Sequence, residues 1–344
     1  MREEGIAAEE STEDYIISFS EDDTRAMSNF MLRNRFLIAD GALWGTNFAA
    51  SADENETICE PKICRMDFST ANDGALFEEM KVIAEQVDVE FLTLGGDYIY
   101  CLVTAMNSGE TSIARIYIPT HGFEILYTGG CDTLQLFQNK LYFSDLNGRF
   151  KSMNTDGSGV EDVLGEREVY YPYIISNEWM CFQDGKDESL KLHHLPSGYE
   201  VQISDGRVFE YVINGSILYF SKVEQGSGMK GRLFRTNLND FFKSFSAASP
   251  PKSFSFVTES SDKNTGTRFS INGDHINGSN YKTYKIKNWK LLDDRQYEIG
   301  YISACQYVGG DYEVFYDYEK EDIIDKIAVY RTVDGKNVYL PRLS

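Results

Sequence analysis

The fold is decided by the stretch KLYFSDLNGRFKSMNTDGSGVEDVL, residues 140–164. Its apolar run LYF predicts a short strand, and DLNG then reverses the chain into a second strand, RFKSMN. The Asp-Gly and Gly-Ser-Gly of TDGSG supply the positive φ angles that tight hairpin turns require, and VEDVL follows as the next strand. The stretch therefore predicts an antiparallel meander.

The same order of turn and strand recurs along the chain. A turn rich in Gly, Asn or Asp precedes a strand pattern in ADGALWGTNF, GGDYIYCLV, QNKLYFSD, SNEWMCFQD, NGSILYFSK, NGDHINGSN and GGDYEVFYD. The spacing of these copies scatters around the ~40–50 residues that one four-stranded blade occupies. The repeat predicts an all-β, seven-bladed β-propeller of four-stranded antiparallel blades. Six blades are the alternative, because HINGSNY in the sixth copy is poor strand material.

One propeller domain is expected over residues 14–344, after an acidic segment, 1–13, that has little apolar surface to bury and should be mobile. The expected blades cover residues 32–87, 88–130, 131–166, 167–206, 207–257, 258–299 and 300–344. The strand-like DYIISFS, residues 14–20, should either close the ring at the outer edge of the last blade or lack fixed structure. Segment 74–86 is interpreted as a blade edge with room for a helical turn, and NDFFKSFSAASPPKS as a loop.

The opening copy resembles the YWTD repeat of the low-density-lipoprotein-receptor type propellers. Residues Tyr142 to Asp145 stand where that family has Tyr-Trp-Thr-Asp, and Asp156 to Gly159 stand where it has Asp-Gly-Ser-Gly. The whole chain is more similar to bacterial relatives of these propellers, an uncharacterised domain-of-unknown-function family that also resembles TolB-type propellers. The match is specific in blade three; blade five keeps Tyr219 to Ser221 but has Lys222 in place of Asp. The receptor family implies six blades, one fewer than the copies counted here.

Composition narrows the classes of partner. The chain has 344 residues, and its 22 Tyr and 22 Phe favour sheet. The formal charge of -21 disfavours nucleic acid, whose binding rests on basic side chains, and anionic membrane. No apolar run approaches the roughly 18 residues needed to span a bilayer. The N-terminus lacks the pattern of a signal peptide, so we expect a cytoplasmic protein; a secreted or cell-surface protein is the alternative if a signal peptide has been removed. We also expect a monomer.

No motif points to catalysis, a cofactor or a resident metal. GSGMKG, residues 226–231, matches Gly-x-Gly-x-x-Gly, but a strand pattern follows it where a dinucleotide site needs a helix. His193 and His194 are adjacent on a strand and point to opposite faces, so they cannot both bind one ion. We therefore nominate no catalytic, cofactor-binding or metal residue and lean away from an enzyme. A hydrolase or lyase at the central channel is the alternative, because such a site leaves little trace in one sequence.

Acidic residues gather in the loops expected between the second and third strands of the blades. The candidate patch joins blades one and seven, and a second acidic group, Asp184, Asp187 and Glu188, lies in blade four. The patch residues are Asp53, Glu54, Glu56, Glu319, Glu321 and Asp322. Such a patch would attract a basic segment or a calcium ion. A solvated, solubilising face is the alternative, since the whole chain is acidic.

Aromatic residues near loop ends are the other candidate contacts. Trp44 and Tyr173 are suited to stack on a sugar or a peptide, although packing between blades explains them as well. The predicted function is a non-catalytic binding or scaffold module that recognises a protein or peptide, basic by charge complementarity, on one loop face. A binder of cell-envelope carbohydrate is a second form of the same class.

Overall fold

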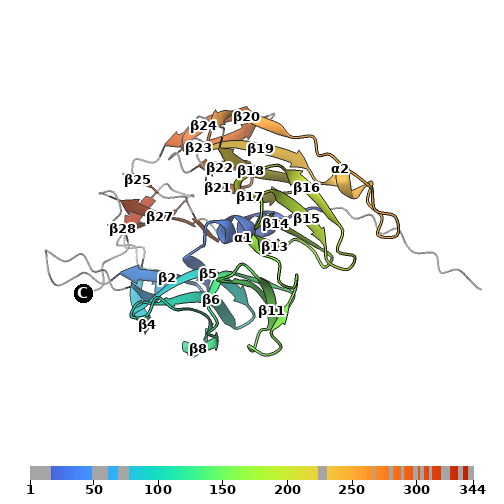
Figure 1. The fold of residues 1–344 in the computed structure, drawn as a ribbon. Helices are drawn as coiled ribbons and strands as arrows, with labels where there is room; N and C mark the ends of the chain where they lie inside the picture. Colours follow the sequence, from blue (N-terminus) through green and yellow to red (C-terminus); the bar gives the residue numbers. More distant parts are fainter. Residues whose placement is uncertain are drawn as a thin grey trace, which may run out of the picture.

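The computed structural model describes residues 17–48, 61–68, 77–223, 231–265, 268–278, 282–287, 290–296, 301–302, 306–309, 312–318, 326–331 and 336–339. Strands in these ranges form seven sheets, six of four strands and one of five, and the paired strands among the described residues are antiparallel. Figure 1 shows the sheets arranged around a central helix, α1. The fold is all-β and has the arrangement of a propeller.

The sheets are meanders of consecutive strands. The first holds β1 (Phe36–Ala39), β2 (Ala42–Phe48), β3 (Pro61–Phe68) and β4 (Phe77–Glu85). The second holds β5 (Val87–Gly95), β6 (Tyr98–Ala105), β7 (Thr111–Tyr117) and β8 (Gly122–Tyr127). The third holds β9 (Cys131–Phe137), β10 (Lys140–Asp145), β11 (Phe150–Asn154) and β12 (Glu161–Asp162). The fourth holds β13 (Val169–Ile174), β14 (Trp179–Asp184), β15 (Leu190–His194) and β16 (Glu200–Ser204).

The remaining sheets follow in chain order. The fifth holds β17 (Val208–Asn214), β18 (Ile217–Val223), β19 (Gly231–Asn237) and β20 (Glu259–Asn264). The sixth holds β21 (Phe269–Asn272), β22 (His275–Gly278), β23 (Lys282–Lys287) and β24 (Lys290–Gln296). The seventh holds β25 (Tyr301–Ile302), β26 (Gln306–Gly309), β27 (Tyr312–Tyr318), β28 (Lys326–Arg331) and β29 (Lys336–Tyr339). Because β1 lies against β26, the first and last sheets are neighbours.

The bounds of two strands, β4 and β20, differ from the expected blade boundaries or elements. The ambiguous segment 74–86 contains strand β4, the last strand of the first sheet, and the structure gives it no helical turn over Phe77–Glu85. Strand β20 belongs to the fifth sheet, whereas the sequence predicts that blade five ends at residue 257. The insertion between β19 and β20 hides this strand, because it separates β20 from its partner by about twenty residues of loop-like sequence.

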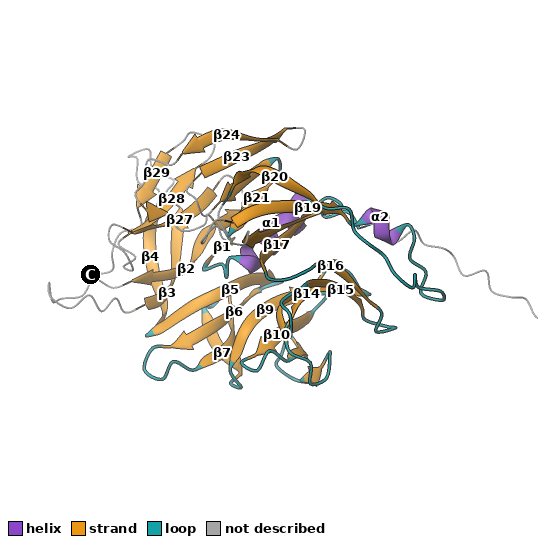
Figure 2. Ribbon diagram, turned by 45° about the horizontal axis from the view of Figure 1, so that its top comes forward, coloured by secondary structure: helices purple, strands orange, loops and turns teal. Residues whose placement is uncertain are grey.

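Stacking explains which strands are buried on both faces. All six residues of β14 are buried, because neighbouring sheets cover both sides of the fourth sheet. By contrast, β8 is the edge strand of the second sheet and has no buried residue. Figure 2 shows the loops and turns at the ends of the strands, with the short helix α2 (Asn239–Phe242) projecting beyond the fifth sheet.

The insertion that carries α2 is more ordered than the predicted loop. Phe241, Phe242 and Phe245 place their rings edge-on against Trp179 of the fourth sheet, with ring centroids 4.7–5.5 Å apart. Edge-to-face contacts of this kind add to the burial of apolar area. The insertion therefore anchors itself to the neighbouring sheet.

Helix α1 (Glu21–Met31) is the main feature that the repeat pattern does not reveal. Ser20 begins it with a capping box: its Oγ accepts from the Asp23 backbone N–H at 3.1 Å, and its own N–H donates to Asp23 Oδ2 at 3.0 Å. The helix contacts β9, β17, β21 and β26, which come from four different sheets, and both ribbon views place it in the middle of the ring. The described residues thus fill the centre of the propeller with a helix.

The segment before α1 corrects the expectation of a closing strand. The Phe19 N–H donates to the Gly215 carbonyl at 2.9 Å, and the Ile17 N–H donates to Asn239 Oδ1 at 3.1 Å. Residues 17–20 therefore lie beside the turn of the fifth sheet and lead into α1, and they do not pair with the last sheet. Residues 14–16 and the acidic segment 1–13 lie outside the described residues.

Hydrogen bonds and ion pairs hold α1 in the ring. Ser28 Oγ donates to the Ile271 carbonyl at 3.3 Å and accepts from the Ile271 N–H at 3.1 Å. Beyond the C-terminal end of the helix, Arg33 pairs with Glu90 at 2.8 Å and with Asp132 at 3.0 Å. These contacts tie α1 to the second, third and sixth sheets, so the helix is an integral part of the fold.

Candidate functional site

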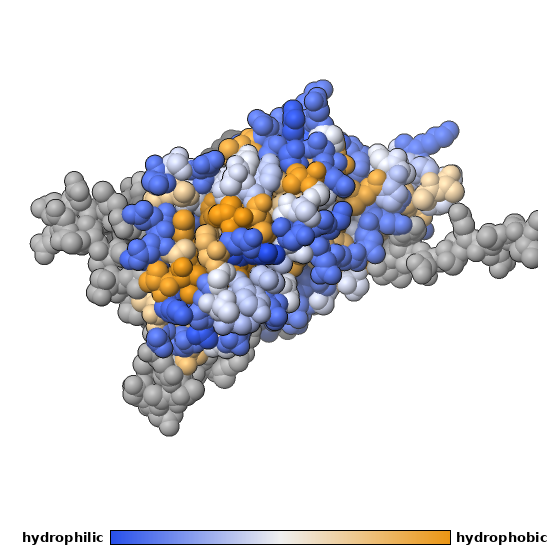
Figure 3. All heavy atoms as spheres, turned by 90° about the horizontal axis from the view of Figure 1, so that it is seen from below, coloured by the Kyte–Doolittle hydropathy of each residue, from blue (hydrophilic) through white to orange (hydrophobic). Residues whose placement is uncertain are grey.

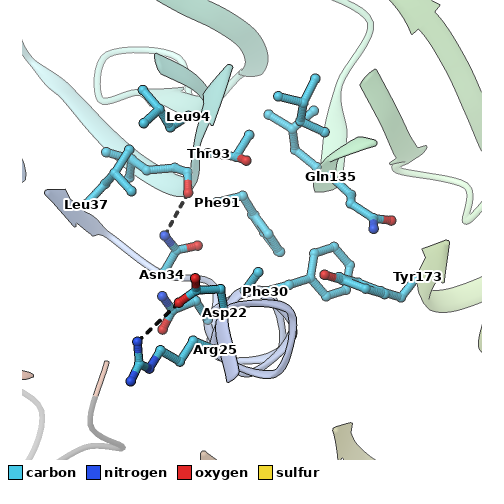
Figure 4. A pocket seen from close by; sticks show the side chains of 15 residues that line it. Asp22, Arg25, Phe30, Asn34, Leu37, Phe91, Thr93, Leu94, Gln135 and Tyr173 are labelled. Atoms are coloured by element: carbon cyan, nitrogen blue, oxygen red, sulfur yellow. Dashed lines mark hydrogen bonds and ion pairs between the residues drawn. The ribbon is translucent and has the colours of Figure 1, made fainter. Parts of the chain in front are cut away.

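A cavity of about 290 Å³ lies between α1 and the first strands of the first four sheets, β1, β5, β9 and β13. Phe30, Phe91 and Tyr173 form its floor, as Figure 4 shows. Leucines from three strands form its wall: Leu37, Leu94 and Leu136. Asp22 and Arg25, from the first turns of α1, stand on the opposite side. We call this cavity the α1 pocket.

The aromatic rings in the floor of the α1 pocket pack against one another. The Phe30 ring meets the Tyr173 ring edge-on with centroids 5.0 Å apart, and the Phe91 ring at 5.3 Å. Phe91 lies in a bulge between Glu90 and Thr93 and has φ of +53°, a left-handed conformation that costs a bulky residue energy. Burial, with the Asp23 charge as a smaller cause, raises the pKa of the Tyr173 hydroxyl above its ordinary value. A phenol held in this way stays neutral at physiological pH.

Two amide side chains in the lining, Asn34 and Gln135, have partners within the protein. The Gln135 amide donates from Nε2 to the Ile174 carbonyl at 2.9 Å and accepts from the Ile174 N–H at 2.8 Å. Asn34 Nδ2 donates to the Leu92 carbonyl at 2.9 Å and to the Phe36 carbonyl at 3.3 Å. These two amides join neighbouring strands, so their bonds stabilise the ring.

The rim of the pocket combines an exposed leucine with charge. Leu94 is 45% exposed at the end of β5. The Arg25 guanidinium contacts three groups: Asn272 Oδ1 at 2.9 Å, Asp22 at 3.2 Å and Glu21 at 3.3 Å. The Asp22 side chain is 91% exposed, which leaves one of its oxygens open to solvent on the side of the pocket. The cavity therefore has an apolar wall of leucines and a side with charged and polar groups.

The pocket opens near one end of the ring, where the turns between first and second strands lie. Leu94 and Leu136 are close to the ends of β5 and β9, and Asn214 Nδ2 donates to the Gly273 carbonyl at 2.7 Å, which joins the corresponding turns of the fifth and sixth sheets. We call this end the first-turn face. Described turns between second and third strands, such as residues 106–110 after β6, emerge at the other end. The acidic patch is predicted in loops of this kind, which in blades one and seven lie outside the described residues.

The two aromatic residues singled out in the sequence have different environments. Tyr173 lies in the floor of the α1 pocket. Trp44 is fully buried: its Nε1 donates to the Ala39 carbonyl at 3.1 Å, and its ring packs against His121 with centroids 5.6 Å apart. The Trp44 ring is therefore used in packing within the protein. This corrects the prediction that it contacts a ligand. The six residues of the candidate acidic patch, Asp53, Glu54, Glu56, Glu319, Glu321 and Asp322, lie outside the described residues.

The acidic residues predicted in blade four form ion pairs and hydrogen bonds within the protein. Burial opposes ionisation of Asp184, but Lys191, at 2.6 Å, and Arg167 outweigh it and hold the pKa of this carboxyl well below its usual range. The Asp187 side chain accepts from the Ser189 N–H at 3.0 Å. Both carboxylates therefore contribute to local structure.

The histidines and cysteines likewise show structural roles. His193 Nδ1 lies 2.9 Å from Glu200, and His194 Nδ1 lies 2.7 Å from the Ser197 hydroxyl. Within the part of the chain that the structure describes, no group of three or more His, Cys, Asp or Glu is placed to hold a metal ion. Burial raises the pKa of the Cys64, Cys101 and Cys131 thiols to about 12, so they stay protonated.

Exposed apolar residues do not concentrate in one broad patch on the side drawn in Figure 3. The view shows apolar groups separated by hydrophilic ones. Large exposed apolar residues include Met106, Ile125 and Leu146, which come from different strands and turns of the second and third sheets. Scattered apolar residues are normal on soluble surfaces. No helix among the described residues has the length and apolar character required to cross a membrane.

One strongly perturbed carboxyl lies outside the α1 pocket. Glu210, on β17, is 3% exposed and accepts from the Phe269 N–H at 2.7 Å. Burial raises the pKa of this carboxyl to about 8, and the charge of Arg268 opposes the rise. The native state therefore holds the Glu210 proton over a pH range in which the unfolded chain has released it.

This proton gives a pH dependence that can be measured. Because the native pKa exceeds the ordinary 4.5, the unfolding free energy should fall as pH rises from about 4.5 to about 8. Between pH 5.5 and 7.5 the wild type should lose about 2–3 kcal/mol relative to Glu210→Gln, at ~1.36 kcal/mol per unit. Urea unfolding at several pH values measures the difference. Glu166→Gln, at an exposed site, should keep the wild-type slope; a wild-type slope in Glu210→Gln would mean that Glu210 is ionised in the native state.

Comparison with known proteins supports the fold and no particular family. No protein-family model matches the chain, and no curated protein matches it. Among solved structures, the computationally designed Ika8 protein aligns with a TM-score of 0.53 at 11% identity, over 88% of this chain and 84% of that one. An oligogalacturonate lyase in complex with manganese aligns with a TM-score of 0.52 at 10% identity, over 89% and 86%.

A structure from a study of two prolyl endopeptidases aligns with a TM-score of 0.56 at 10% identity, over 94% of this chain. This chain spans about half, 52%, of that protein. The neighbours are propeller-like proteins and include enzymes, and at such low identity the likeness extends to the fold alone. The resemblance of blade three to YWTD repeats stays a prediction.

Proposed function

We propose that the protein is a non-catalytic binding propeller that recognises a protein or peptide at its first-turn face, with the α1 pocket as the anchor point. The observation that carries the proposal is the pocket itself. Its volume of about 290 Å³ lies just below the range of roughly 300–1,000 Å³ typical of small-molecule sites, and suits one large side chain. A cavity of this size beside an exposed leucine fits a surface that receives an anchor residue from a partner.

The same proposal covers the finer features of the fold. We take the seven sheets as seven blades of one closed ring, related to the bacterial YWTD-like and TolB-like propellers, and expect a cytoplasmic monomer. A hydrolase or lyase centred on the channel has less support, because α1 occupies the middle of the ring. An acidic patch on the opposite face, formed by blades one and seven, remains a second candidate surface for a basic partner or calcium.

The test is selection from a displayed random-peptide library on the immobilised full-length protein. We expect a shared apolar position among the selected peptides. Leu94→Arg should lower the affinity of a selected peptide at least about tenfold, equivalent to ~1.4 kcal/mol, because a guanidinium would stand in the apolar wall. Met106→Arg is the matched control: Met106 is 50% exposed, follows β6 at the other end of the ring, and should leave the affinity within about twofold.

Two results would reject the proposal. The first is a selection in which wild type enriches no peptide above a blank surface. The second is a set of peptides that Leu94→Arg binds as well as Met106→Arg does, which would place the binding surface away from the α1 pocket.

A further inference from the structure

We propose that the α1 pocket selects an apolar side chain that is followed or preceded by Lys or Arg in an extended peptide segment. This inference rests on the proposed function and adds the chemistry of the partner. Three properties of the pocket carry it: a wall of leucines, two lining amides, Asn34 and Gln135, that are already hydrogen-bonded, and an excess of carboxylates at the mouth.

The lining favours an apolar group in the cavity. Leu37, Leu94 and Leu136 face the rings of the floor across the cavity, as Figure 4 shows for the first two. The Asn34 and Gln135 amides are used in bonds between strands. A polar group inserted here would lose water without gaining these amides as partners, and such a loss costs free energy. Burial of an aliphatic or aromatic side chain in the cavity is favourable, because it removes apolar surface from water.

Close packing keeps the wall apolar and fixed. Gly95 follows Leu94 at the end of β5, and a Cβ added there would lie 2.5 Å from Leu136 Cδ2. Glycine at this position therefore lets Leu136 approach β5. The two leucines come from neighbouring sheets, and both line the α1 pocket.

The mouth carries more negative than positive charge. Glu21 and Asp22 share one guanidinium, that of Arg25, which also bonds Asn272. The exposed Asp97 lies in the turn that follows Leu94 and Gly95. These three carboxylates outnumber the two cations of the same segments, Arg25 and Lys140, and Lys140 also pairs with Glu161 at 3.9 Å. The apolar wall beside them reduces screening by water. A cationic residue next to the anchor complements this charge, as does the chain's formal charge of -21 with any basic partner.

Three displayed libraries test the inference, identical except for a fixed central pair: Leu-Arg, Leu-Gln or Leu-Glu between randomised flanks. We expect the full-length protein to enrich the Leu-Arg library at least about tenfold over the Leu-Glu library. The double variant Glu21→Gln/Asp22→Asn should lower the affinity of a selected Leu-Arg peptide roughly fivefold and flatten its salt dependence. Glu166→Gln, as exposed as Asp22 but between the third and fourth sheets, is the control and should leave both unchanged.

The outcomes separate this inference from the proposed function. Equal enrichment of all three libraries, with binding lost in Leu94→Arg, would overturn the preference for a basic neighbour and leave peptide binding in place. Preference for Leu-Glu would overturn it as well. Enrichment of none of the libraries would reject peptide binding at the pocket and this inference with it.

Discussion

Phe30→Ala is expected to lower the free energy of unfolding by about 3–5 kcal/mol, the range observed when a buried phenylalanine is truncated. Phe30 is 4% exposed and its ring contacts Phe91 and Tyr173, which come from two different sheets. The truncation removes the part of α1 that joins these sheets and leaves a void beside an existing cavity. Urea unfolding followed by circular dichroism measures the loss.

Met106→Ala serves as the control for this variant, because Met106 is half exposed and should change stability by less than about 0.5 kcal/mol. Phe30→Leu should fall between the two, since leucine retains part of the apolar volume. A loss in Phe30→Ala no larger than that in Met106→Ala would mean that α1 is not packed in the centre of the ring in solution.

Gly45→Ala is expected to lower the free energy of unfolding by roughly 3–4 kcal/mol, at or above the upper end of typical losses from overpacking. Gly45 is buried in β2 opposite Phe36, and an added Cβ would lie 2.3 Å from Phe36 Cδ1 and 2.4 Å from the Arg35 carbonyl oxygen. The carbonyl belongs to the backbone that leads from α1 into β1, so it cannot move without displacing the helix.

Gly122→Ala is the matched control within a strand. Gly122 begins the edge strand β8, and the nearest atom to an added Cβ there is Thr120 Oγ1 at 3.4 Å. This variant should be neutral or slightly more stable, because alanine restricts the unfolded chain more than glycine does. Equal thermal melting of the two variants would contradict the close approach of β2 to the residues before β1.

The strands were predictable from sequence because their signals are local. The turn Gln138–Asn139 and the apolar run after it predict β10, and β10 and β11 pair as the meander requires. Blade six was the weakest prediction, yet β22 pairs with β21 and β23 in spite of its poor strand composition. Packing against neighbouring sheets stabilises β22 although its residues have low strand propensity, since tertiary packing overrides a weak local preference.

Helix α1 is predictable from local sequence, although the β repeat draws attention away from it. Ser20 and Asp23 have the spacing of a capping box, and Met27, Phe30 and Met31 follow at helical intervals. Those residues predict a helix with an apolar face. They do not predict that the helix fills the channel, because that place is set by strands from several sheets that are distant in sequence.

The α1 pocket was not predictable as a site. Its floor joins Phe30, Phe91 and Tyr173, and only Tyr173 was singled out, as an aromatic residue near a loop end. No Gly, Asn or Asp at position 91 predicts the left-handed conformation of Phe91. Packing in the ring holds that conformation, and the local sequence does not. The excess of carboxylates at the mouth is likewise hidden in a chain that is acidic throughout.

The most direct measurement is a crystal structure of the full-length protein with a selected peptide. We expect density for an apolar side chain between Leu94 and Leu136, a basic side chain near Asp22, and α1 in the same place as in the free protein. A peptide bound at the opposite end of the ring, or one that displaces α1 from the channel, would contradict it.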